Sequence, residues 1–174
     1  MPLCVVLLAG AVGCTNSMDD VSRFERQAPP DQELRQAHIW RSEYGKLQLE
    51  LTAPVIRQYR SPDTRTLYPE GVDLTFYTDE REKKTFIHAE KAISYDDKNL
   101  LKASDSVVVI DYAGGDTIYL EDIIWNSNED IIYSNHAVRS VNGNRVTYGD
   151  GFVSDENMEN LRIRHQRGMI EFED

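Results

Sequence analysis

Apolar and polar residues alternate with a period of two along most of the chain from His38 onward. Leu47, Leu49 and Leu51 alternate with polar residues, and similar alternation recurs over residues 72–76 and 118–121. Period two is typical of half-buried strands, because successive side chains of a strand point to opposite faces of the sheet. No stretch after His38 shows the apolar stripe of a helix. The pattern therefore predicts an all-β domain.

Short polar and glycine-rich segments separate the predicted strands. They occupy residues 96–99, 113–116, 126–130 and 142–144, and consist mainly of Asp, Asn, Gly and Ser. These residue types favour tight turns because they tolerate the backbone conformations that hairpin loops require. The strands are therefore expected to be joined as antiparallel hairpins.

An internal repeat organises the domain. Residues 51–59, 87–95, 117–125 and 146–154 each predict a strand with a bend, followed by a turn. The unit recurs about every 30 to 36 residues, which indicates a row of hairpins stacked along one axis. Since one hairpin cannot bury its apolar face alone, two facing layers are expected to enclose a shared interior. The ends of such a stack are strand edges open to pairing with another chain.

Three features resemble the LptC family, a periplasmic component of lipopolysaccharide export. They are the repeat of strand, bend and aspartate-rich turn, the segment 118–126 followed by 130–134, and residues 146–154 with their Tyr-Gly-x-x-Phe core, followed by 161–163. The resemblance covers residues 38 to 172. It implies a single open β-jellyroll, twisted into a boat or V shape, whose interior receives the acyl chains of lipopolysaccharide. It also implies docking on an inner-membrane ABC transporter at one end and pairing with a bridge of similar jellyrolls at the other.

The inward positions of the predicted strands supply an apolar lining for such an interior. The predicted lipid-groove residues are Leu49, Leu51, Leu74, Phe76, Ile87, Ala89, Val107, Val109, Ile118, Leu120, Ile132, Val138 and Phe152. The alternative is that these residues form a close-packed core. In that case the protein is a structural or interaction lipoprotein that binds only protein partners.

The two ends of the stack are candidate partner edges. Trp40 and Leu47 mark the N-terminal end, which the resemblance assigns to the transporter. Gly149, Leu161, Ile163 and Ile170 mark the C-terminal end, assigned to the bridge. Ordinary terminal strands with no partner are the alternative for both ends.

The start of the chain resembles a bacterial lipoprotein signal. Residues 3–13 are apolar, end in small residues and directly precede Cys14. The predicted divisions are a signal peptide over 1–13, a lipidated Cys14 with a tether over 14–37, and the jellyroll domain over 38–174. The signal alone is compatible with an anchor in either the inner or the outer membrane. The resemblance to the LptC family implies the periplasmic face of the inner membrane. A buried N-terminal strand or helix is the alternative reading of the apolar run.

Composition narrows the remaining function classes. The formal charge is −11 at pH 7, which disfavours nucleic acid as a partner. Both cysteines precede Thr15, so the domain has no Cys-ligated zinc site or thiol nucleophile. The four histidines show no ligand spacing, and no serine has a nucleophile elbow around it. Acidic pairs such as Asp96 and Asp97 are read as solvated turn residues, with weak cation binding as the alternative.

We therefore expect a protein that is not an enzyme and has no metal and no cofactor. A secreted hydrolase with a β fold is the remaining alternative. Mutation of every histidine and acidic turn residue would test it, because a non-enzymatic protein should keep its cellular role.

Overall fold

The computed structural model describes residues 29–155 and 159–171, which fold almost entirely into strands. The elements are β1 Gln32–Glu43, β2 Lys46–Tyr59, β3 Arg65–Tyr68, β4 Val72–Tyr77, β5 Lys83–Ala89, β6 Lys91–Tyr95, the short 3₁₀ helix η1 Asp96–Lys98, β7 Leu100–Asp111, β8 Asp116–Asn126, β9 Ile131–Asn142, β10 Arg145–Asp155, β11 Arg162–Ile163 and β12 Gly168–Glu171. The predicted all-β class is confirmed. Within the described ranges, no helix is long and apolar enough to cross a membrane.

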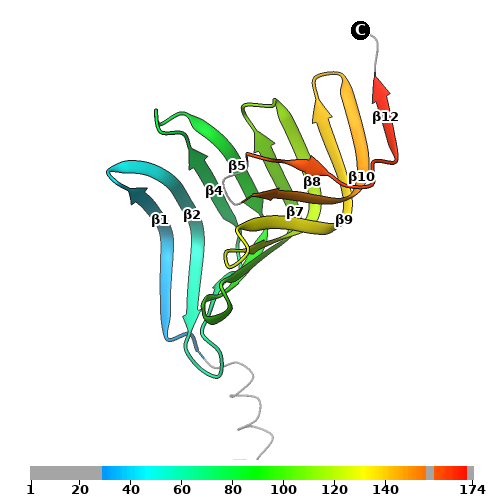
Figure 1. Ribbon diagram of the computed structural model, residues 1–174. Helices are drawn as coiled ribbons and strands as arrows, with labels where there is room; N and C mark the ends of the chain where they lie inside the picture. Colours follow the sequence, from blue (N-terminus) through cyan, green and yellow to red (C-terminus); the bar gives the residue numbers. More distant parts are fainter. Residues whose placement is uncertain (1–28, 156–158, 172–174) are drawn as a thin grey trace, which may run out of the picture.

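The strands form one antiparallel sheet of 12 strands (Figure 1). Its main order is β11-β10-β9-β8-β7-β5-β4-β2-β3-β6, with β1 beside β2 and β12 beside β10. All four predicted turn segments connect consecutive strands, as the hairpin prediction required, although Asp116, Asn126 and Asn142 are the end residues of strands. The additional pairing of β7 with β6 closes a circuit of strands through β2, β4, β5, β7, β6 and β3.

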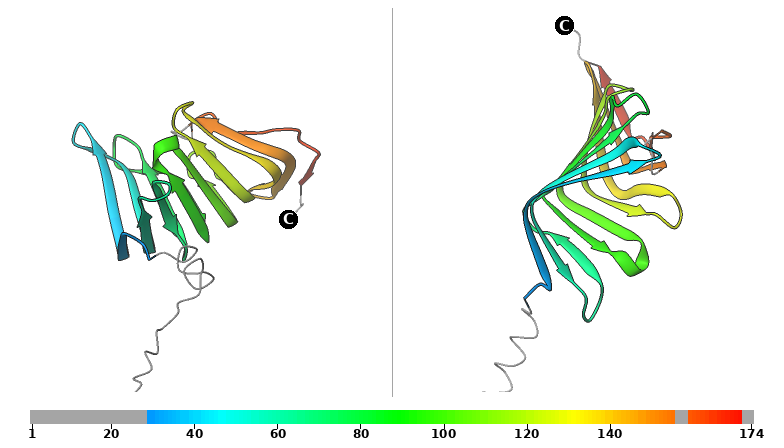
Figure 2. Two further views of the ribbon diagram at one scale, coloured as in Figure 1. Left: turned by 90° about the horizontal axis from the view of Figure 1, so that it is seen from below. Right: turned by 90° about the vertical axis from the view of Figure 1, so that its left-hand side faces the viewer.

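The sheet is folded into two limbs that meet at a ridge, which is the V shape expected for a jellyroll of this kind (Figure 2, right). The first limb is built on β4 and β5, and the second on β3 and β6. Strand β2 runs through both, because Leu49–Thr52 pair with β4 while Arg57–Tyr59 pair with β3. Strand β7 does the same, pairing with β6 before the ridge and with β5 after it.

The ridge follows backbone irregularities in the long strands. Gln36 in β1, Asp105 and Ser106 in β7, and Gly151 in β10 have φ of 51°, 63°, 55° and 101°. The pairing register shifts at the same level in β7, β8 and β10. Such bulges bend a strand and raise its local twist. Each segment of the internal repeat crosses the ridge, so the predicted bend is confirmed in all four.

The second repeat crosses the ridge in two pieces. Residues 87–95 break at Glu90 into the end of β5 and the whole of β6. The backbone N–H of Glu90 still has a hydrogen-bond partner at this break, because it donates to the carbonyl of Asp105 at 3.0 Å. This hydrogen bond joins two strand bends at the ridge.

The domain begins earlier than the sequence pattern predicted. Residues 32–37, assigned to the tether, lie in β1, where Leu34 pairs with Ile56 and packs against the core. Period two is weak in this stretch, because β1 is a mostly exposed edge strand with few inward apolar positions. The predicted signal peptide and the lipidated Cys14 lie outside the described residues.

Candidate functional site: the interior between the limbs

The predicted groove residues lie in the interior between the limbs. Twelve of the thirteen are at most 9% exposed and belong to one continuous apolar cluster. Leu51 is half-buried and packs against the same cluster. Near the ridge, the interior is therefore filled by the side chains of the protein itself.

The second limb adds core residues that the sequence pattern did not identify. Ile56, Ala92, Ala103 and Ile123 are each at most 7% exposed and belong to the same cluster. The side chains of the two limbs thus meet across a shared interior, as two facing layers must to bury their apolar faces.

An aromatic pair joins the limbs away from the ridge. Phe76 on β4, in the first limb, lies with its ring centroid 6.2 Å from that of Trp125, which comes from the second-limb half of β8. The rings are tilted by 57°, an arrangement typical of favourable aromatic contacts. The pair connects the two walls of the V by side chains alone, with no strand pairing between them.

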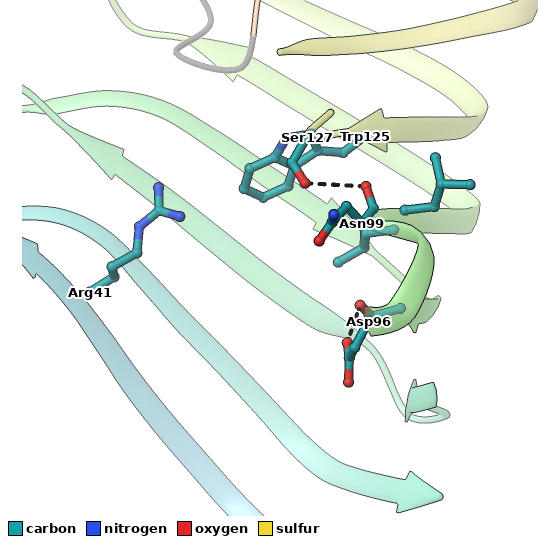
Figure 3. A pocket seen from close by; sticks show the side chains of 8 residues that line it. Arg41, Asp96, Asn99, Trp125 and Ser127 are labelled. Atoms are coloured by element: carbon teal, nitrogen blue, oxygen red, sulfur yellow. Dashed lines mark hydrogen bonds between the residues drawn. The ribbon is translucent and has the colours of Figure 1, made fainter. Parts of the chain in front are cut away.

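Two hollows flank this aromatic pair, and Arg41 of β1 lines both. The first has a volume of about 300 Å³ and combines Leu100, Leu101 and Trp125 with polar groups of the η1 turn. Figure 3 shows Arg41 across this hollow from Trp125, Asn99 and Ser127. The lining thus combines apolar side chains with polar groups that include the cationic Arg41 and the acidic Asp96.

The second hollow, of about 600 Å³, lies on the first-limb side of the aromatic pair. Phe76 and Tyr77 contribute to its lining. It is bounded by an ion pair between Lys84 of β5 and Glu159, with Nζ and Oε1 2.9 Å apart. This ion pair ties the chain that follows β10 to the first limb.

The interior also contains polar atoms. The indole nitrogen of Trp125 and the hydroxyls of Thr85 and Ser154 are buried, with no hydrogen-bond partner among the described residues. Buried donors without partners are uncommon in native proteins and cost free energy. The lining is therefore apolar but not uniformly so.

The N-terminal edge of the sheet is open. Strand β1 pairs on one side with β2 and, within the described residues, with no other strand. Ile39 and Trp40 on this strand are 46% and 58% exposed. Leu47, also predicted as an edge residue, lies instead on the next strand, β2, where it pairs with Ser42. Leu47 follows the turn that joins β1 to β2, and the sequence pattern did not show which of these two strands forms the edge.

The C-terminal edge is covered by the chain itself. Gly149, predicted as an edge residue, is buried in β10 because residues 161–171 fold back along this strand. The outermost strands are β11, which contains Ile163, and β12, which contains Ile170 with 47% exposure. Leu161 is half-buried against the core. Gly149 was therefore wrongly assigned to an open edge.

A buried carboxylate lies at the ridge between β8 and β9. The Asp122 side chain is only 8% exposed and accepts hydrogen bonds from Ser134 Oγ at 3.0 Å and from the His136 ring at 2.7 Å. Burial pushes the pKa of Asp122 upward, but the contacts with His136, Ser134 and Lys102 together outweigh burial and lower it. The same contact with Asp122 raises the pKa of His136.

This pair predicts a pH-dependent contribution to stability. A raised histidine pKa means that protonated His136 stabilises the folded state fully below its unfolded pKa near 6.5, and loses this effect as pH rises through the higher folded value. Asp122 acts in the opposite direction, since its contribution is lost as pH falls through its lowered pKa. We expect His136→Gln to reduce the free energy of unfolding more at about pH 5.5 than at about pH 8.5.

Urea unfolding of both proteins at the two pH values measures this difference. His165→Gln is the control, because the His165 ring contacts the Asp150 carbonyl at 3.2 Å and, over residues 29–155 and 159–171, no carboxylate. An equal loss at both pH values for His136→Gln would show that the Asp122 contact does not depend on histidine charge.

Together, the fold and the interior define a class of protein: a β-jellyroll with an apolar interior between two limbs and strand edges at both ends of the stack. Residues 2–171 match the family described as "Lipopolysaccharide-assembly, LptC-related", and the chain belongs to this family. Among curated proteins, none matches the chain significantly.

Membership gives the chain a role in lipopolysaccharide transport on the periplasmic side of the inner membrane, as a transport component. The family match also extends the similarity from residues 38–172, where sequence motifs placed it, to almost the whole chain.

Proposed function

We propose that this protein receives the acyl chains of lipopolysaccharide between its two limbs and passes them on to a similar jellyroll. The observation that supports this most strongly is the continuous apolar interior, with the two hollows on either side of the aromatic pair. An acyl chain entering there meets the partly buried Leu101 and Trp125 before it reaches Phe76 and the rest of the buried cluster.

The energetics favour entry by separation of the aromatic pair. Contact between two aromatic rings contributes about 0.5–1.5 kcal/mol beyond area burial. Burial of one methylene group contributes about 0.8 kcal/mol. Two or three methylenes between Phe76 and Trp125 therefore offset the loss of that contact. Deeper insertion must displace packed side chains, which keeps burial partial and allows release.

The ends of the stack provide the partner surfaces in this proposal. The open β1 edge, with Ile39 and Trp40, faces the inner-membrane ABC transporter. The C-terminal end, with β11 and β12, faces the bridge jellyroll. A lipid anchor on Cys14 holds the chain at the periplasmic face of the inner membrane. Strand addition at the open β1 edge gives affinity through main-chain hydrogen bonds.

A second candidate is a lipoprotein with a filled core that binds only proteins. The burial of twelve predicted groove residues in one cluster favours it. The two candidates differ in one respect, which is whether lipid contacts the inner face in the working protein.

Photo-crosslinking in cells tests the carrier proposal. A benzophenone amino acid replaces Leu51 or Leu101, which are half-buried on the inner face and tolerate a larger side chain better than fully buried positions. We expect a lipopolysaccharide adduct at both positions, detected by a mass shift and by antibody against the sugar.

The matched control is Tyr119 on β8, which is 42% exposed and stacks under Arg139 on the outer face. No adduct is expected there. If variants that still support growth give no adduct at either inner position, the filled-core candidate is correct and the carrier proposal is wrong.

A further inference from the structure

Residues 161–171, called here the C-terminal cap, follow β10 from Arg145 to Val153. Arg162 and Ile163 pair with Val153 and Phe152, and Gly168–Glu171 pair with Arg145–Tyr148. Between these two strands, the backbone N–H of Asp150 donates to the Arg164 carbonyl at 3.0 Å, and that of Arg164 donates to Gly151 at 2.9 Å. The cap thus supplies backbone partners to the outer side of β10 on both limbs.

Side chains fix the cap at the ridge. Arg164 donates through Nη2 to the Ser134 carbonyl at 2.8 Å and to Asn135 Oδ1 at 2.6 Å, so it reaches past β10 to the bend of β9. Arg167 forms an ion pair with Asp150. The cap is therefore attached by charged groups as well as by strand pairing.

A close backbone approach at Gly149 makes this docking specific. A Cβ atom at Gly149 would lie 2.7 Å from the Arg164 carbonyl oxygen and closer still to Ile163 Cγ2. Gly149 does not have a positive φ, so its backbone conformation is open to other residues. The glycine is required by contact with the cap and not by the strand itself.

Without the cap, β10 would match the free edge of β1 in another copy. Strand β1 has 12 residues and β10 has 11. Strand β1 runs from the second limb to the first and bends at Gln36, whereas β10 runs from the first limb to the second and bends at Gly151. If two copies stack in the same orientation, these strands are antiparallel and their bends coincide.

Long unprotected edges that match in this way cause uncontrolled association. The outer side of the cap presents a much shorter strand edge for pairing, because β11 and β12 have only two and four residues and Arg164 to Arg167 separate them. We propose that the C-terminal cap keeps β10 from accepting the β1 edge of a second copy, so that an uncapped chain associates head to tail. This holds whether or not the interior receives lipid.

The full chain with Gly149→Val tests the proposal, because the valine side chain collides with the cap and leaves the pairing of β10 with β9 in place. A benzophenone at Ile39 reports on the β1 edge. On illumination we expect a ladder at multiples of the 20.0 kDa chain. In the capped protein the tethered cap competes for β10 at a high effective concentration. Its displacement should therefore increase the dimer band at least about tenfold over the capped protein.

Three matched variants establish the route of association. Gly168→Val places the same side chain in the cap where no atom lies within 4 Å of the new Cβ, and no ladder is expected. Adding Trp40→Lys to the Gly149→Val chain puts a charge on the β1 edge and should abolish the ladder. A benzophenone at Tyr119, on the outer face, should give no ladder in any chain.

A second test does not depend on how well Gly149→Val folds. A chain ending at Asn160 lacks the cap, and a synthetic peptide of residues 161–171 restores it in trans. We expect the truncated chain to give the ladder and the peptide to remove it. A folded uncapped chain that stays monomeric, or a ladder that persists with Trp40→Lys or with the peptide, overturns the proposal.

Discussion

Phe152→Ala should lower the free energy of unfolding by about 3–5 kcal/mol. Phe152 is fully buried on β10 just beyond the ridge and is the largest of the side chains with less than 2% exposure. Its removal leaves a cavity between the limbs, which rigid paired strands on both sides cannot close. Total stabilities of single domains are about 5–15 kcal/mol, so this loss is a large share.

Denaturant unfolding followed by circular dichroism measures this change. Tyr44→Ala is the control, since Tyr44 lies in the β1–β2 turn and is 97% exposed. Its effect should stay within about 0.5 kcal/mol. A loss below about 1 kcal/mol for Phe152→Ala would mean that the interior is loose at this level and not packed.

Gly151→Ala is expected to cost about 2–3 kcal/mol, for two separate reasons. Gly151 has φ of 101°, a conformation that residues with a Cβ atom rarely adopt. A Cβ atom there would also lie 2.9 Å from the Arg164 guanidinium and 3.1 Å from the Ser134 carbonyl oxygen. Bending β10 at the ridge therefore requires glycine at this position.

Thermal and urea unfolding measure the loss, with Gly168→Ala as the matched control that has neither a positive φ nor a neighbour within 4 Å. The same substitution in an Arg164→Ala background separates the two causes. In that background the loss should become smaller but persist, because the backbone strain remains. Complete recovery would mean that Gly151 serves only to make room for Arg164.

The fold class and the hairpins could be predicted because they depend on local sequence. Alternation and turn residues at 96–99 or 142–144 depend on neighbours in sequence, and they placed the hairpins correctly. The inward positions on the first limb, such as Leu74 and Ile87, followed directly from period two.

Some inward positions on the second limb, such as Ile123, were missed because bulges change the phase of the alternation. In β8, Ile118 and Leu120 point inward before the ridge, whereas Ile123 and Trp125 do so after it. Period two counted straight through would turn Trp125 outward. The register shift between Leu120 and Ile124 reverses this phase, and it depends on pairing with β7 and β9.

The cap could not be predicted from alternation either. Strands β11 and β12 have two and four residues, too short for a period to be recognised. The signal available in the sequence was Gly149, a glycine inside a predicted strand. In the structure this glycine does not have a positive φ. A glycine inside a strand often marks a close approach of another backbone, and here that backbone belongs to Arg164.

The closed circuit through β2, β4, β5, β7, β6 and β3 gives the two ends of the molecule different mechanical character. Every strand of the circuit has a partner on both sides, so none can leave without breaking two rows of hydrogen bonds. Strand β1 and the strands from β9 to β12 can instead peel away one at a time. An increase in the angle between the limbs therefore strains the closed circuit in the N-terminal half of the sheet. In the C-terminal half, the strands outside the circuit can move apart more easily.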